Sequence, residues 1–163
     1  MDDEWSAALD GFAAVWERVS SPPETAAAAE QPRDPAAELR TFLTQEAQRT
    51  AYYAAAAALA EPRQREQLRA LSGDCRQALK KLRTECFLLT GEQRTVSMPR
   101  LQNDGCLGFL RRSYLSELAG EREYAAAAAC TEKAELRRVY AELAERCAAR
   151  RESVRALVHG LLG

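Results

Sequence analysis

A duplicated pattern of one glutamate, one tyrosine and five alanines constrains the fold of this chain more than any other feature. Glu46 stands seven residues before Tyr53, and five alanines follow the tyrosine directly. Glu117 and Tyr124 repeat the arrangement at an offset of 71 residues (117 − 46), again with five alanines behind. Repeated helices that each point one carboxylate inward are the ground plan of four-helix bundles that carry metal ions. The repeat therefore predicts an all-α four-helix bundle with a polar centre.

Helix boundaries follow from the spacing of apolar residues and from the breaks between them. Apolar residues recur at steps of three or four, which is the period of an amphipathic helix. Proline and glycine break the pattern at Pro62 and Gly91, and the polar stretch 91–106 is predicted to be a long connection. Thr131 is the predicted N-cap of the last helix. Two helical hairpins joined by a single crossover are expected, with predicted helices at residues 37–60, 64–89, 107–130 and 132–161.

The chain before the bundle has a different character. A stripe of apolar residues at helical spacing predicts a short amphipathic helix over residues 1–20, and the proline- and alanine-rich residues 21–36 predict a flexible linker. The bundle itself is assigned to residues 37–163. Because Trp5 and Trp16 share the stripe, leaving them in water would be costly. The helix is expected to dock on the bundle or on a second copy in a homodimer, with capture of another protein as the alternative.

Charge and cysteine content narrow the class of protein. The 163 residues suit one domain, and a formal net charge of −1 indicates no broad basic surface for nucleic acid or anionic lipid. Neither a signal peptide nor a membrane-spanning stretch is evident. The number of cysteines, five, is odd, and no two of them form a CxxC pair. A disulfide framework is therefore not expected, and a cytoplasmic location is expected.

The predicted seams of the helices are apolar except near their middles. A carboxylate-bridged site for two metal ions needs four acids and two histidines, with Glu-x-x-His on two of the helices. When the apolar positions of the second and fourth helices are aligned, Cys75 and Cys147 take the glutamate positions, and Ala78 and Arg150 take the histidine positions. A rival register aligns Cys75 with Glu145 instead, which recovers one acid at a ligand position. Both registers lack both histidines.

A family resemblance covers about residues 37–160. The stretches that carry it include FLTQEAQRTAYYAAAAALAE, LRALSGDCRQALKKL and LRRSYLSELAGEREYAAAAAC. Together they resemble the ferritin-like domain of the rubrerythrin group, and the segment FAAVWERVS is similar to the N-terminal arm of some bacterial members. The resemblance implies a ferritin-like bundle and, in typical members, di-iron redox or peroxide chemistry. This chain departs from the family pattern at four of six ligand positions, which are Cys75, Ala78, Cys147 and Arg150.

The preferred hypothesis is a bundle that has lost its di-iron centre and acts, without a cofactor, as a non-catalytic binding or scaffold protein. Two inward carboxylates without metal would be costly to bury. Arg150 and Arg49 are expected to supply the compensating positive charge, and Tyr53 and Tyr124 to donate their hydroxyls to the carboxylates.

Two alternatives stay open. The first is a metal-binding oxidoreductase, either di-iron or with one Zn²⁺ or Fe²⁺ held by Glu46, Glu117, Cys75 and Cys147. The second is a thiol switch in which Cys75 and Cys147 become cross-linked on oxidation. In that switch Arg150 would lower the pKa of a neighbouring thiol and burial would raise it, so the sequence leaves the balance undecided.

Overall fold

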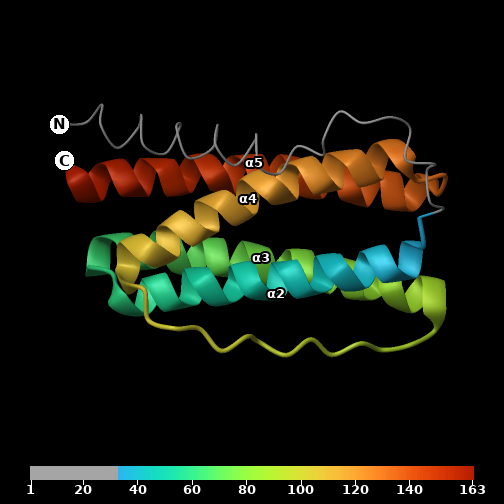
Figure 1. Cartoon of the computed structure of the whole chain (residues 1–163), viewed down its shortest axis with the longest axis horizontal. Helices are drawn as coiled ribbons and strands as arrows, with labels where there is room; N and C mark the ends of the chain where they lie inside the picture. The colour runs from blue at the N-terminus through green and yellow to red at the C-terminus, as the bar shows by residue number, and fades with distance from the viewer. Residues whose placement is uncertain (1–32) are drawn as a thin grey trace, which may run out of the picture.

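The computed structural model describes residues 33–163, and within that range it contains four α-helices and no strands (Figure 1). The prediction of an all-α fold is therefore confirmed for these residues. The N-terminal helix predicted for residues 1–20 lies outside the described residues, as does most of the linker. The helices are α2 (Pro35–Leu59), α3 (Pro62–Thr90), α4 (Gly105–Cys130) and α5 (Ala134–Leu162).

Local signals in the sequence account for the helix ends. Asp34 caps α2 by accepting a hydrogen bond from the backbone N–H of Ala36 at 3.1 Å. Proline occupies the first position of both α2 and α3, where no backbone N–H is needed. Gly91 ends α3 with φ of 74°, and its N–H donates to the carbonyl of Phe87 at 2.7 Å. A residue with a side chain would be strained in that left-handed conformation.

The predicted helix start at Thr131 is wrong. Thr131 is the C-cap of α4, where its N–H donates to the carbonyl of Ala127 at 3.0 Å. Its hydroxyl accepts a hydrogen bond from the N–H of Lys133 at 3.3 Å and closes a turn between the two helices. Because the hydroxyl is used in that turn, α5 begins two residues later than predicted, with Lys133 at its N-cap.

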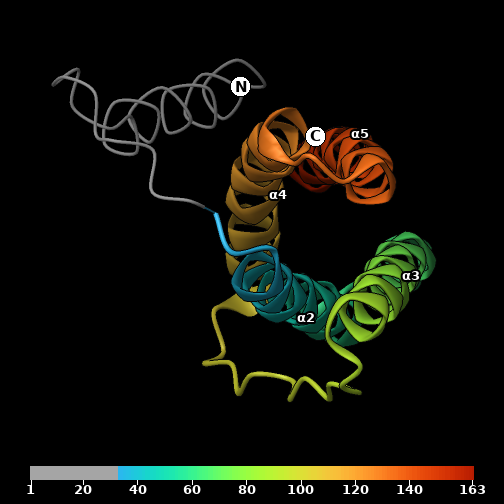
Figure 2. The ribbon, with the colours of Figure 1, turned by 90° about the vertical axis from the view of Figure 1, so that its right-hand side faces the viewer.

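The helices pack as two hairpins whose inner members meet. α2 packs on α3 and α4 packs on α5, and the hairpins are joined mainly through α2 and α4. Seen along the bundle, α3 and α5 lie at the two ends of an open arc and make few contacts with each other (Figure 2). The connection at residues 91–104 runs along the outside of the bundle from the end of α3 to the start of α4 (Figure 1).

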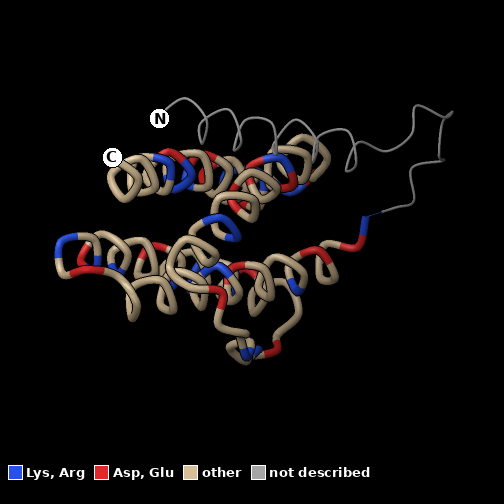
Figure 3. Tube along the Cα trace, turned by 60° about the vertical axis from the view of Figure 1, so that its left-hand side comes forward, with Lys and Arg blue, Asp and Glu red and all other residues tan. Residues whose placement is uncertain are grey.

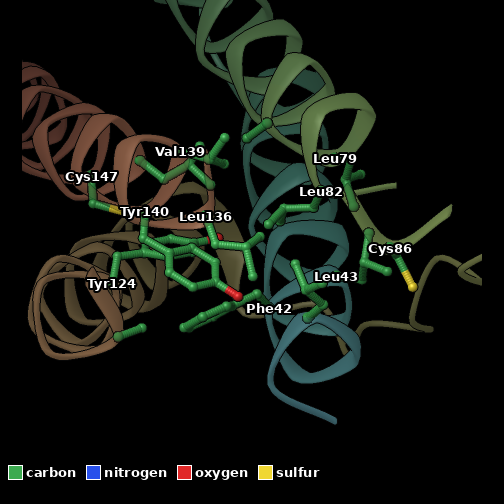
Figure 4. Packing of buried hydrophobic residues seen from close by; sticks show 14 of the residues in the cluster. Phe42, Leu43, Leu79, Leu82, Cys86, Tyr124, Leu136, Val139, Tyr140 and Cys147 are labelled. Carbon is green, nitrogen blue, oxygen red and sulfur yellow. The ribbon is translucent and has the colours of Figure 1, made fainter. Parts of the chain in front are cut away.

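Two apolar clusters fill the interior, one toward each end of the bundle. A set of buried polar residues lies between them. One cluster is aromatic: the ring of Phe42 lies 4.3 Å from that of Tyr124 and 5.2 Å from that of Tyr140, centroid to centroid (Figure 4). The other cluster, near the opposite end, is aromatic as well as aliphatic and contains Tyr53, Phe109 and Leu110. The polar layer thus lies at the boundary between two apolar regions, where water has little access.

None of the four helices within residues 33–163 combines the length and the apolar character that crossing a membrane would require.

Candidate functional site, a buried layer of charged residues

Four charged side chains lie in the interior of the bundle. Glu46 and Arg49 come from α2, Glu117 from α4 and Arg150 from α5. The two glutamates are 0% exposed, and the two arginines are 1% and 2% exposed. Two carboxylates and two guanidinium groups balance to zero formal charge. An unpaired buried charge costs several kcal/mol, so the stability of this layer depends on how completely its members are paired.

Arg150 connects acids on the three other helices. Its Nε donates to Oε1 of Glu117 at 2.8 Å and its Nη2 to Oε2 of the same carboxylate at 3.1 Å, which is a two-point pair. Nη2 also lies 3.4 Å from Oε1 of Glu46. Nη1 donates to Oδ2 of Asp74 on α3 at 2.8 Å. One guanidinium group on α5 therefore joins α2, α3 and α4 at a single level of the bundle.

Arg49 neutralises the carboxylate of Glu46, and its guanidinium group fits only because residue 120 is glycine. Its Nη1 donates to Oε1 of Glu46 at 2.8 Å. Its Nε donates to the hydroxyl of Ser116 and its Nη2 to the carbonyl of Ser116, both at 3.0 Å. A Cβ atom at position 120 would lie 2.4 Å from Nη2 and 2.8 Å from Cζ of Arg49. Gly120 thus leaves the space in which the guanidinium group lies against α4.

The two tyrosines of the repeat cross between the hairpins. The hydroxyl of Tyr53 donates to Oε1 of Glu117 at 2.8 Å, and that of Tyr124 donates to Oε1 of Glu46 at 2.9 Å. Each repeat therefore supplies the hydrogen bond for the glutamate of the other repeat. Burial, reinforced by the neighbouring carboxylate, raises the pKa of both tyrosines, so both hydroxyls stay protonated and act as donors.

The guanidinium groups keep their charge in spite of burial. Burial alone would lower the pKa of Arg49 and of Arg150. The charges of Glu46 and Glu117 outweigh that effect and raise the pKa of each arginine. Both arginines are therefore permanent cations of this layer.

Cys75 and Cys147 lie in the same layer as the four charged side chains. Both are 0% exposed, and Sγ of Cys147 lies 3.4 Å from Nη2 of Arg150. Burial raises the pKa of both thiols well above the usual range, and this outweighs the lowering effect of Arg150. The thiol, rather than the nucleophilic thiolate, is the stable form of each at neutral pH. All five cysteines are free.

A ladder of ion pairs closes the side of the layer between α3 and α5. Arg146 of α5 lies 3.2 Å from Oδ1 of Asp74 and 3.0 Å from Oε1 of Glu142, and Glu142 also binds Lys81 of α3. Because these two helices make few other contacts, the ladder is the main link between them at this level. Asp74 is about a third exposed (36%) and forms the end of the network of Arg150 that faces water.

Three members of this network were not predicted: Asp74, Ser116 and Gly120. A glycine inside a helix costs about 1 kcal/mol relative to alanine, so Gly120 carried a signal of close approach. The signal is unspecific, because Gly73 also lies inside a helix and has no atom within 4 Å of its would-be Cβ. Asp74 and Ser116 follow no pattern that marks them as partners of a buried arginine.

The residues present do not fit the di-iron centre that the family resemblance implies. Nη2 of Arg150 lies within hydrogen-bonding distance of both glutamates, so a positive group already bridges Glu46 and Glu117. A metal ion between the same carboxylates would be repelled by that guanidinium group. Within residues 33–163, no group of three or more His, Cys, Asp and Glu side chains has the arrangement of a metal site.

Comparison of the chain with protein-family models, with curated protein sequences and with solved structures finds no match. What the layer can do therefore follows from its own residues.

Proposed function

We propose that this protein is a bacterial-type, ferritin-like bundle that has lost its di-iron centre and acts as a non-catalytic binding or scaffold protein. One observation carries the proposal: the guanidinium group of Arg150 bridges the two glutamates of the repeat, 3.1 Å from Glu117 and 3.4 Å from Glu46. The arginine supplies there the positive charge that a metal ion would supply in the rubrerythrin-type proteins that the sequence resembles.

The protonation of the layer favours a structural role over catalysis. Catalytic acids, bases and nucleophiles work best when their pKa lies near the working pH. In this layer the thiols of Cys75 and Cys147 and the hydroxyls of Tyr53 and Tyr124 have raised pKa values, and the arginines stay charged. None of these groups gains or loses a proton easily at neutral pH.

What the layer supplies instead is a fixed register of four helices. A shift of α5 by one turn would remove Arg150 from its acceptors on the three other helices and leave buried carboxylates unpaired. Buried polar groups set helix register in this way in some coiled coils. A bundle held in one register presents constant outer faces, which is the property that a scaffold needs.

The partner and location proposals rest on the surface of the bundle. Several large apolar side chains remain exposed, among them Leu88 at 71% and Met98 at 50%, and they are candidates for contact with a second copy or another protein. Five free cysteines, one of them the exposed Cys130, favour a reducing compartment such as the cytoplasm. Measuring the mass in solution of the full chain and of its Leu88→Glu variant tests whether the exposed Leu88 takes part in a homodimer contact.

Elemental analysis tests the loss of the metal centre. Protein produced with added iron and zinc and purified under reducing conditions is expected to carry metal far below one equivalent, because Arg150 occupies the bridging position. Near-stoichiometric metal that disappears in Cys75→Ser would contradict the proposal and favour the metal-binding oxidoreductase.

A converted variant tests the resemblance itself. The substitutions Cys75→Glu, Ala78→His, Cys147→Glu and Arg150→His restore the ligand pattern of the rubrerythrin group at all six positions. If the bundle is of that kind, the converted protein takes up two equivalents of Fe²⁺ under anaerobic conditions and the wild type does not. A folded converted protein that takes up no iron would argue against the family assignment.

A further inference from the structure

The net charge of −1 conceals a marked segregation of charge along the chain. Residues 1–32 contain seven acidic residues and a single arginine, for a net charge of −6, so residues 33–163 carry +5. The excess is concentrated on α3, which has seven basic and three acidic residues. Figure 3 colours the basic residues of the described part of the chain blue and its acidic residues red. The total charge of the chain therefore does not describe α3, which carries a local basic excess.

Part of this basic helix forms one wall of a groove. Arg65, Arg69 and Arg76 lie on one side of α3, and together with alanines of α2 they line a groove of about 570 Å³. The floor on the α2 side consists of the small side chains of Ala54, Ala57 and Ala58, and Ser72 of α3 completes the lining. The spacing of the arginines, four and then seven residues, keeps them on one face of the helix.

The arginines of this groove have unused donors within the described part of the chain. Arg65 is positioned by a hydrogen bond from its Nη2 to the carbonyl of Ala60 at 3.0 Å, and its Nε is buried without an acceptor among residues 33–163. Arg69 and Arg76 are exposed and form no ion pair with another described residue. A buried donor and two unpaired cations beside an alanine floor suit a ligand that is both acidic and apolar.

We infer that the occupant of this groove is the N-terminal segment of the same chain, residues 1–20, called here the arm. The arm combines the two required properties: it has acidic residues at Asp2, Asp3 and Glu4 and a stripe of large apolar residues that begins with Trp5. Its aromatic rings cover the alanine floor, where small side chains leave room for them. Its carboxylates meet the guanidinium groups, and an arginine beside an aromatic ring adds a cation–π contact.

The linker is long enough for the arm to reach the groove of its own bundle. Pro35 and Ala57 are 22 residues apart on α2, which is about 33 Å at 1.5 Å per residue. Residues 21–34 span at most about 46–50 Å when fully extended. Docking therefore requires no second copy, and a short tether keeps the arm at a high effective concentration near the groove. This inference goes beyond the proposed function and is independent of whether the buried layer holds a metal.

Tryptophan fluorescence isolates the arm, because Trp5 and Trp16 are the only two tryptophans of the chain. In the full-length wild type, the emission is expected to be blue-shifted from that of tryptophan in water. It is expected to shift to the red with added salt as the ion pairs are screened. Emission typical of exposed tryptophan in the wild type at low salt would overturn the inference.

A charge-reversal pair locates the docking site. Arg69→Glu with Arg76→Glu is expected to shift the emission to that of exposed tryptophan. Arg137→Glu with Arg138→Glu, which changes the net charge equally at exposed positions of α5, is expected to leave it unchanged. Circular dichroism of both variants checks that the helices persist. Equal shifts in the two pairs, or none in the first, would overturn the assignment to this groove.

Two further measurements complete the test. Substituting Asp2, Asp3 and Glu4 by lysine in the Arg69→Glu, Arg76→Glu protein is expected to restore the blue shift, since the charges are exchanged across the contact. The wild-type emission is also expected to be independent of protein concentration. A blue shift that grows with concentration together with a dimeric mass would overturn docking within one chain, because it would show that the arm binds a second copy.

Discussion

The two hairpins of the bundle share their carboxylates and tyrosines but differ in where they place positive charge. The first hairpin contributes Glu46 and Tyr53, and the second contributes Glu117 and Tyr124 at the same spacing. The first supplies its arginine, Arg49, from its leading helix α2. The second supplies Arg150 from its trailing helix α5. The acidic framework is symmetric, and the cations that neutralise it are not.

Each arginine has a small residue as its counterpart in the other hairpin. Position 120, the repeat equivalent of position 49, is glycine, and Arg49 fills the space beside it. Position 78, the equivalent of position 150, is a fully buried alanine. One guanidinium group per hairpin is therefore enough to neutralise the layer, because each tyrosine donates a hydrogen bond to the carboxylate of the opposite hairpin. Each glutamate thus takes its closest cation from its own hairpin and its tyrosine from the other.

The largest effect is expected from removing the cation of the second hairpin. Arg150→Met leaves Glu117 without its two-point partner, and the loss of a buried pair costs about 3–5 kcal/mol in the free energy of unfolding. Urea denaturation followed by circular dichroism measures the change. Adding Glu117→Gln to Arg150→Met removes the uncompensated charge and is expected to recover part of the loss. A loss below about 1 kcal/mol in the single variant would show that Arg150 is not essential to the layer.

The symmetric part of the comparison is tested at the two tyrosines. Tyr53→Phe and Tyr124→Phe each remove one hydrogen bond to a buried carboxylate, which is worth about 1.5–3 kcal/mol. Because the bonds have nearly equal lengths, the two losses are expected to agree within about 1 kcal/mol, as measured by urea denaturation. Tyr52 is also buried, but its hydroxyl is hydrogen-bonded to the exposed Arg112 rather than to a buried carboxylate, so Tyr52→Phe is the control and is expected to lose less. A large loss in only one of the first two variants would contradict reciprocal bonding.

The asymmetric part is tested at two glycines inside helices. Gly120→Ala places a methyl group against the Arg49 guanidinium and is expected to cost about 1–3 kcal/mol through overpacking, despite the better helix propensity of alanine. Gly73→Ala meets no neighbouring atom and is expected to gain about 0.5–1 kcal/mol. Thermal unfolding of both variants gives the signs directly. A stabilising Gly120→Ala would show that the close approach of Arg49 is not needed.

The smallest effect concerns the thiols that occupy equivalent places in the two hairpins. Folding raises the pKa of Cys75 and Cys147 above the usual value of 9.0. Their contribution to stability is therefore complete below about pH 9 and is lost as pH rises beyond it. The free energy of unfolding is expected to fall less steeply between pH 9 and 10 in Cys75→Ala, Cys147→Ala than in Cys130→Ala, which removes an exposed thiol. Equal slopes in the two proteins would contradict the raised pKa values.

Much of the fold was predictable because helical periodicity is local. The inward positions of the repeated glutamates and tyrosines follow from a 3.6-residue period and from apolar neighbours three and four residues away. The turn at Thr131 was misread because a hydroxyl that caps a helix and one that closes a turn have the same sequence signature. The contact between Asp74 and Arg150 was not predictable, because α3 and α5 meet only through the tertiary arrangement. The basic groove on α3 was missed because the total charge averages it against the acidic N-terminus.

Stability in the presence of metal tests most directly whether Arg150 stands in for a metal ion. Unfolding by urea is measured under anaerobic, reducing conditions with a chelator, with Fe²⁺ and with Zn²⁺. The midpoint is expected to be the same in all three, because a folded state without a metal site gains nothing from the ion. A metal that bound the native layer would add about 2.7 kcal/mol at a concentration 100 times its Kd. A gain of that size in the wild type that vanishes in Cys75→Ser would contradict the account.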